Sequence, residues 1–169
     1  MEKEALLTTV QDKLKTQFGE SFISSEIAYD YPVFTIQPEI ICDVVRFLYN
    51  DNELAFQYLT TLAGIHYPDH KGKELGVIYH LHNLPKNLRI RIKIFFSSSD
   101  PVVPTITPVF SAANWMERQE YDFFGIIFKG HPNLKRILNM DEMTYFPMRK
   151  EYPLEDGTRE DKDDKMFGR

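Results

Sequence analysis

The sequence predicts an α+β fold, in which helices pack on a mostly antiparallel sheet and a long irregular C-terminal extension follows. Three observations lead to this prediction. Apolar residues recur at helical spacing in separate stretches, neighbouring stretches alternate apolar and polar residues as strands do, and X-Pro pairs interrupt the last third. The 169 residues suffice for one domain with its own core. We place residues 1–128 in the α+β domain and residues 129–169 in an extended partner-binding arm with a charged tail.

Two amphipathic helices are expected in the first third of the chain. The first covers residues 2–18 and ends before Gly19, with an apolar stripe made of Leu6, Leu7, Val10, Leu14 and Phe18. After a short extended stretch at 33–36, Pro38 suits the first position of a second helix, which ends near Asn50. Its stripe consists of Ile40, Ile41, Val44, Val45 and Leu48. Each stripe indicates a helix with one face on the core.

A β-hairpin gives the clearest strand pattern. Residues 75–81 alternate apolar and polar side chains, and LRIRIKIFF at 88–96 alternates without a fault after a Pro-containing loop. Upstream, residues 54–65 carry both periods, and we interpret them as a strand followed by a short helix. Downstream, residues 102–106 lie between prolines and therefore predict a short or edge strand.

A third helix is predicted from about residue 107 to residue 124, where Gly125 ends it. On a helical wheel, Glu120 falls in the middle of the apolar side, so its carboxylate needs a partner or a proton. Arg118 and Asp122 fall on the opposite side at the spacing of an ion pair along a helix.

The composition argues against several classes of protein. A net charge of −5 and a pI near 5.5 disfavour general attraction to nucleic acid. The single cysteine, Cys42, provides neither an internal disulfide nor a cysteine pair for zinc or an iron–sulfur cluster. No stretch approaches the roughly 18 apolar residues of a membrane helix, and no signal or transit peptide is visible. We expect an intracellular protein that meets a membrane through its partners only.

Paired carboxylates leave open a free-standing acid–base enzyme, because Glu117 and Glu120 lie one helical turn apart. No nucleophile motif accompanies them, so hydrogen-bond and salt-bridge roles are the preferred interpretation. Two histidine pairs have ligand-like spacing, His66 with His70 and His80 with His82. Because neither pair has a convergent third ligand, we predict no metal site.

A basic row occupies one face of the second hairpin strand and comprises Arg89, Arg91 and Lys93. A solvated sheet face is the preferred interpretation, and a surface for an acidic partner is the sharper alternative. An RNA-binding module is a further alternative, although Phe95 alone shares the alternation of the row and could stack on bases.

Two segments of the arm, HPNLKRIL and PMRKEYPL, combine prolines, cationic residues and large apolar residues. This combination suits an extended arm laid across another protein, and it equally suits a coil packed back on its own domain. On the first interpretation, Arg136, Arg149 and Lys150 pair with partner carboxylates. The apolar residues that then fill partner pockets are Phe146, Met148, Tyr152 and Leu154.

Residues 113–154, beginning ANWMERQEYDFFGIIF, resemble the 30 kDa subunit family of NADH:quinone oxidoreductase, which is the C subunit of respiratory complex I. The resemblance assigns family motif positions to Glu117, Arg118, Tyr121, Asp122, Phe124 and Gly125, then to His131, Pro132, Leu134, Arg136, Ile137 and Leu138, and finally to Pro147, Arg149, Lys150, Tyr152 and Pro153. Four positions depart from the usual family residues, namely Gln119, Glu120, Met148 and Glu151. Gln119 stands where the family usually has a glutamate, and Glu120 offers a carboxylate one residue further along the chain.

The resemblance implies a hetero-oligomeric subunit of the peripheral arm of a proton-translocating complex. Its implied neighbours are the large D subunit, which shapes the quinone cavity and which we call the quinone-cavity subunit, and the iron–sulfur subunits. The resemblance implies no cofactor on this chain, with FMN, iron–sulfur clusters and quinone in the partner subunits. The expected place is the cytoplasmic side of the bacterial inner membrane. A related ferredoxin-linked quinone reductase or membrane-bound hydrogenase remains an alternative assembly.

Overall fold

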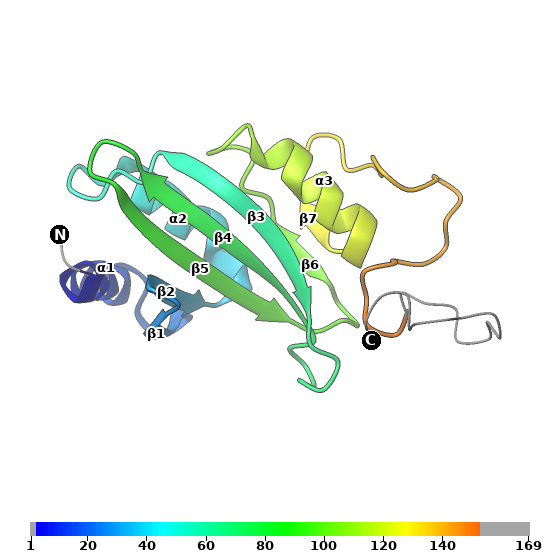
Figure 1. Cartoon of the computed structure of the whole chain (residues 1–169), viewed down its shortest axis with the longest axis horizontal. Coiled ribbons are helices and arrows are strands. Elements are labelled where there is room, and N and C mark those ends of the chain that lie inside the picture. Colours follow the sequence, from blue (N-terminus) through cyan, green and yellow to red (C-terminus); the bar gives the residue numbers. More distant parts are fainter. Residues whose placement is uncertain (1–2, 153–169) are drawn as a thin grey trace, which may run out of the picture.

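The computed structural model describes residues 3–152 and shows helices packed on one face of a five-stranded sheet (Figure 1). The helices are α1 (Lys3–Phe18), α2 (Ile41–Asn50) and α3 (Ala113–Phe124), with short 3-10 turns at Gly19–Ser21 and Pro38–Ile40. The strands are β1 (Phe22–Ala28), β2 (Tyr31–Ile36), β3 (Tyr58–His66), β4 (Leu75–Asn83), β5 (Leu88–Phe96), β6 (Val102–Pro104) and β7 (Ile127–Lys129). The predicted α+β class is confirmed.

The strand order of the large sheet is β1-β2-β5-β4-β3. All neighbours are antiparallel except β2 and β5, which run parallel in register from Val33 beside Arg91 to Thr35 beside Lys93. The chain reaches β5 from β2 by way of α2 and the β3–β4 hairpin. The central strand of the sheet is therefore the last of its five strands in the sequence. The predicted β4–β5 hairpin is confirmed along its whole length.

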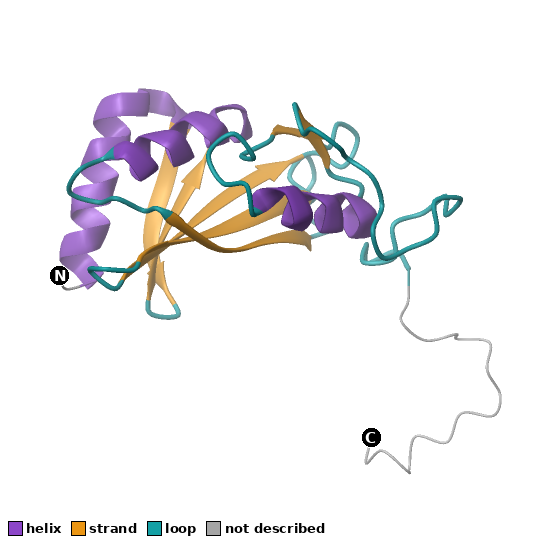
Figure 2. Ribbon diagram, turned by 90° about the horizontal axis from the view of Figure 1, so that it is seen from above, coloured by secondary structure: helices purple, strands orange, loops and turns teal. Residues whose placement is uncertain are grey.

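One hydrophobic core lies between the sheet and its helices (Figure 2). On α2, every residue of one stripe is fully buried, namely Ile41, Val44, Val45 and Leu48. The apolar residues that alternate along β5 point to the same side and are buried there, namely Leu88, Ile90, Ile92, Ile94 and Phe96. The opposite face of the sheet carries no helix among residues 3–152 (Figures 1 and 2).

Three sequence-based assignments need correction. The short helix predicted after residue 58 is wrong, because β3 pairs with β4 through to His66 and an irregularity between Leu59 and Thr61 disturbs its alternation. The third helix begins at Ala113 and not near residue 107, since turns closed by hydrogen bonds to Ile106 O precede it. Strands β1 and β7 were not predicted at all.

The small parallel sheet of β6 and β7 fixes the two ends of the α3 region. Val103 lies beside Phe128 in this pair, and the Thr105 N–H donates to Lys129 O at 3.0 Å. The short strand predicted between the prolines is thereby confirmed. Because β7 spans the boundary that the sequence suggested at residue 128, the arm begins from a strand anchored to the domain.

Candidate partner-binding surface

Helix α3 packs tightly on β3 through a glycine. The Gly64 N–H donates to Glu120 Oε2 at 2.7 Å. A Cβ atom at Gly64 would lie 2.5 Å from that oxygen and 2.6 Å from the Phe124 ring, so a side chain there has no room. The absence of a side chain at this position therefore brings the helix close enough for a buried carboxylate to reach strand backbone.

The C-terminus of α3 turns sharply at Gly125, which adopts a left-handed φ of +74° and donates its N–H to Tyr121 O at 2.9 Å. This geometry suits a residue without a Cβ atom. The turn sends the chain into β7, and the arm then returns so that the Phe146 ring covers Gly125. Of the two interpretations of residues 131–152, the structure shows a coil packed back on its own domain.

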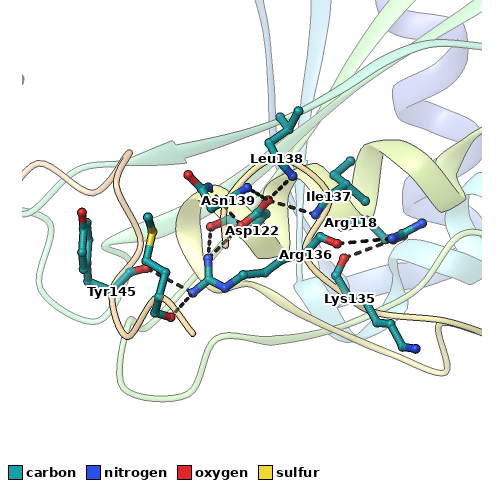
Figure 3. A network of polar contacts seen from close by, with 9 residues as sticks. Arg118, Asp122, Lys135, Arg136, Ile137, Leu138, Asn139 and Tyr145 are labelled. Atoms are coloured by element: carbon teal, nitrogen blue, oxygen red, sulfur yellow. Dashed lines mark hydrogen bonds and ion pairs between the residues drawn. The ribbon is translucent and has the colours of Figure 1, made fainter. Parts of the chain in front are cut away.

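Asp122 organises the first part of the arm (Figure 3). Its fully buried carboxylate accepts a hydrogen bond from Arg136 Nη1 at 2.7 Å and from the backbone N–H groups of Ile137, Leu138 and Asn139 at 2.8 to 3.1 Å. Burial by itself raises the pKa of the Asp122 carboxyl, but the bonds from Asn139, Leu138 and Arg136 together hold this pKa well below its usual 3.8. Asp122 is therefore charged, and its hydrogen bonds hold the loop of residues 136–139 in place.

The Arg136 side chain donates its hydrogen bonds to acceptors within the chain. Besides the Asp122 carboxylate, its guanidinium donates to Asp122 O at 2.9 Å, to Met143 O at 2.9 Å and to Tyr145 O at 3.1 Å. Its side chain is 8% exposed. The expectation that Arg136 pairs with a carboxylate of another protein is therefore replaced by an internal pair with Asp122.

The predicted Arg118–Asp122 pair along the helix is wrong. Arg118 instead donates to the backbone oxygens of Lys135 at 3.1 Å and Arg136 at 3.3 Å (Figure 3). Its guanidinium also stacks over the Trp115 ring. The arm approaches this side of α3 and supplies partners that helical spacing does not reveal. Both charged residues thus bind the arm to the helix.

A second set of contacts fastens the arm at residues 146–149. The guanidinium groups of Arg136 and Arg149 both lie over the Phe146 ring, at 5.1 and 5.0 Å from its centroid. Arg149 Nε donates to Phe124 O at 2.7 Å, and the Met148 N–H donates to Phe123 O at 3.2 Å. These bonds occupy carbonyls that the end of a helix leaves without intrahelical partners.

Two histidines complete the attachment of the arm. His131 accepts the Asn133 N–H at Nδ1 and places Nε2 3.0 Å from Asn114 O, at the start of α3. His66, at the end of β3, accepts the Lys150 N–H at Nδ1. Within residues 3–152 no three His, Cys, Asp or Glu side chains form a group able to hold a metal ion.

The predicted interface residues therefore divide by burial. Their buried members are Glu117, Asp122 and Gly125, the partly buried ones are Arg118, Tyr121, His131, Arg136, Pro147 and Arg149, and the exposed ones are Pro132, Lys150 and Tyr152. Pro153 lies outside the described residues. Most of these residues thus fix the shape of the arm, and Pro132, Lys150 and Tyr152 are the exposed members of the predicted set within residues 3–152.

Large apolar side chains are exposed on the arm and on α3, namely Trp115, Leu138, Met140, Tyr145, Met148 and Tyr152, and we call them the arm surface. The exposed fraction is 62% for Trp115, 63% for Leu138 and 69% for Met140. Sequence reasoning selected Met148 and Tyr152 and missed the rest. For Leu138, Met140 and Tyr145, the signal that could have found them is large apolar residues in a segment that prolines prevent from forming a regular element.

Glu117 and Glu120 point into the core and not into an open cleft. Glu117 accepts from the Thr105 hydroxyl at 2.5 Å and from the Ile106 N–H at 2.8 Å, and it is fully buried. Burial raises the pKa of the carboxyls of Glu117 and Glu120 from 4.5 to about 7, against the opposite effect of their hydrogen bonds. Hydrogen-bond roles, and not acid–base catalysis on a substrate, fit this placement.

These raised pKa values predict that the free energy of unfolding decreases as the pH rises. The folded chain holds both protons up to near pH 7 whereas the unfolded chain releases them near 4.5, so the stabilisation is complete below pH 4.5 and is lost as pH rises through 7. At about 1.4 kcal/mol per pKa unit, the loss reaches up to about 3 kcal/mol per carboxyl. Urea unfolding at pH 5 and pH 8 measures it. Glu120→Gln should flatten the pH dependence, and an unchanged slope would contradict this assignment.

Comparison with known proteins adds to this geometry. Residues 34–158 match the family model described as "Respiratory-chain NADH dehydrogenase, 30 Kd subunit". The NADH-quinone oxidoreductase C subunit of Roseiflexus sp. (strain RS-1) is 39% identical over 86% of this chain and 83% of its own length. The corresponding C subunit of Nocardioides sp. (strain JS614) is 43% identical over 72% of this chain. The chain spans about half the length of that relative, 48%.

Solved structures show the same fold. The trypsin-resistant fragment (1-134) of Nqo5 superimposes with a TM-score of 0.63 at 26% identity, covering 79% of this chain and all of the fragment. A chain of the membrane-bound sulfane sulfur reductase, an archaeal respiratory membrane complex, reaches a TM-score of 0.72 at 21% identity over 91% of this chain and 87% of its own. Within residues 3–152, no helix has the length and apolar character needed to cross a membrane.

Proposed function

Because the chain belongs to the 30 kDa subunit family of respiratory-chain NADH dehydrogenase, we propose that it is a structural and assembly subunit of a proton-translocating NADH:quinone oxidoreductase. It docks on the quinone-cavity subunit of the peripheral arm, near the quinone site. Its contribution to electron transfer from NADH to quinone is to hold other subunits in place. Iron–sulfur subunits are further neighbours, and the complex holds the chain at the cytoplasmic side of the bacterial inner membrane.

The observation that supports docking most strongly is the arm surface on its rigid support. Five of its six apolar side chains lie within residues 138–152, and exposed apolar side chains gathered in this way are typical of interaction sites. Here the backbone beneath them is fixed by the Asp122–Arg136 pair and by the contacts of Phe146 with Gly125. A surface shaped in advance loses little conformational entropy when a partner binds. A shift of that surface would also displace groups at a neighbouring quinone site.

The chemistry of the reaction belongs to other subunits in this proposal. FMN, the iron–sulfur clusters and quinone are carried by the partners. This chain offers one cysteine, Cys42, whose pKa is raised chiefly by burial. A thiol held protonated in this way is a poor cluster ligand, because cluster ligation requires thiolate.

Substitution of the arm surface tests the proposal. Leu138→Asp places a charge where an apolar contact is expected and should lower the recovery of the quinone-cavity subunit with the tagged chain by about tenfold, the scale of one interface hot spot. Leu84→Asp is the matched control, because Leu84 is 57% exposed in the loop of the β4–β5 hairpin. Affinity purification from native membranes with mass spectrometry gives the readout.

Two outcomes would contradict the proposal. Equal recovery of the quinone-cavity subunit with Leu138→Asp and with Leu84→Asp would remove the arm surface from the interface. Recovery of the unsubstituted chain without a flavin subunit and without NADH:quinone activity would favour a ferredoxin-linked quinone reductase or a membrane-bound hydrogenase as its assembly.

A further inference from the structure

The open face of the large sheet presents a row of cationic side chains along its central strand. On β5, Arg89, Arg91 and Lys93 point away from the helices, opposite the buried residues with which they alternate. In the register of the sheet, Arg91 lies between Val33 of β2 and His80 of β4. No helix covers this face among residues 3–152 (Figure 1).

Arg91 is held in a fixed position on this face. Its Nε–H donates to His80 Nε2 at 3.2 Å, which requires the neutral form of that ring. Its guanidinium lies over the Tyr31 ring at 5.4 Å from the centroid. Within the described part of the chain its two terminal nitrogens have no acceptor. A guanidinium held by one nitrogen and one face, whose outer nitrogens are not buried, is organised for bidentate binding of a carboxylate.

The side chains around Arg91 define what binds there. Lys93 lies 3.3 Å from Glu26, and Arg89 is exposed and adds a second cation to the row. On the β3–β4 side, Ile78, Ala63 and Ile65 are partly buried and continue the face as an apolar strip. The face thus combines cations along its centre with apolar contact area beside them.

We propose that this open face is a second docking surface, distinct from the arm surface, and that it binds an acidic segment of a neighbouring polypeptide whose carboxylate pairs with Arg91. The inference rests on the proposed function, because it takes the chain to work inside a protein assembly. The apolar strip then accepts apolar residues that alternate with the acidic ones in the bound segment.

A polypeptide fits this face better than an RNA strand. Base stacking needs free aromatic faces, but the Tyr31 ring is occupied by Arg91 and Phe95 lies 6.3 Å from Tyr67 between ring centroids.

Site-specific photocrosslinking in the native complex tests the proposal. A benzophenone amino acid replaces Thr61, which is exposed on β3 in register with His80. Illumination of membranes is expected to link it to one subunit, within a segment of net negative charge. Arg91→Glu should lower the yield about tenfold, the scale of one lost charge-assisted pair. Arg89→Glu should lower it about threefold and leaves the His80 and Tyr31 contacts intact.

Lys15→Glu is the matched control, since Lys15 is exposed on α1 on the helical side of the sheet. An unchanged yield with both Arg91→Glu and Arg89→Glu, a product that contains RNA or lipid only, or no protein product would overturn the proposal. A failure of the proposed function gives a different result, because Leu138→Asp would leave the recovery of the quinone-cavity subunit unchanged. If Leu138→Asp lowers the recovery of the quinone-cavity subunit but the arginine variants leave the crosslinking yield unchanged, only the docking surface on the open face is contradicted.

Discussion

Asp122→Ala is expected to lower the free energy of unfolding by about 3–5 kcal/mol, the range observed when one partner of a buried ion pair is removed. Arg136 is 8% exposed and would be left without its countercharge. The backbone N–H groups of Ile137, Leu138 and Asn139 would lose their common acceptor as well. Single substitutions on the exposed sheet edge should lower the free energy of unfolding by less, because exposed side chains have few buried partners.

Chemical denaturation of the full chain measures this loss, and matched variants separate its causes. Asp122→Asn keeps one oxygen acceptor and should cost less than alanine. Asp122→Ala combined with Arg136→Met removes the stranded cation and should recover part of the loss, because the two residues are coupled. If the double variant is less stable than the single one by the full cost of Arg136→Met, the pair is not coupled as described.

Acid should produce the same weakening without any substitution. The folded pKa of Asp122 lies below its ordinary 3.8, so its stabilisation is complete above the unfolded pKa and is lost as pH falls below it. Glu117 and Glu120 act in the opposite direction, since their pKa values of about 7 favour the folded chain at lower pH. The two effects together favour a stability maximum between the two ranges.

Periodicity explains why much of the fold was predictable. Helix α2 and strand β5 each bury a face that their own sequence marks, so local pattern and tertiary packing agree. Strand β1 failed this test because FISSEIA lies at the sheet edge and buries little beyond Phe22. Strand β7 is Ile127–Lys129, too short for any alternation to stand out.

The candidate site was predictable in position but not in its hydrogen bonds. The dense run of charged and aromatic residues correctly marks the α3 region as special, and Glu120 is recognisable as a carboxylate inside an apolar stripe. A helical wheel places Asp122 on the solvent side because it considers only its own helix. The donors to Asp122 come from Arg136 and the residues after it, and their approach depends on the left-handed turn at Gly125. Such long-range pairing leaves no periodic signal.

Gly125→Ala is expected to lower the free energy of unfolding by about 2–5 kcal/mol. A left-handed φ of +74° costs an L-residue about 1–2 kcal/mol. The new Cβ atom would also collide with the Phe146 ring, and forced repacking of this kind adds about 1–3 kcal/mol. The second cost falls on the arm, so Phe146 should move away from the guanidinium groups of Arg136 and Arg149.

Gly72→Ala separates the two costs, because Gly72 has a similar φ of +78° and a Cβ atom added there would meet no atom of residues 3–152 within 4 Å. Thermal or urea unfolding should show the backbone cost alone at Gly72 and the larger sum at Gly125. Phe146→Ala added to Gly125→Ala removes the collision, so the double variant should lose less than the sum of the single losses. Protease cleavage within residues 136–146 should rise for Gly125→Ala and stay unchanged for Gly72→Ala. Equal losses at the two glycines would mean that Phe146 does not pack on Gly125, and the arm surface would then lack the support on which docking depends.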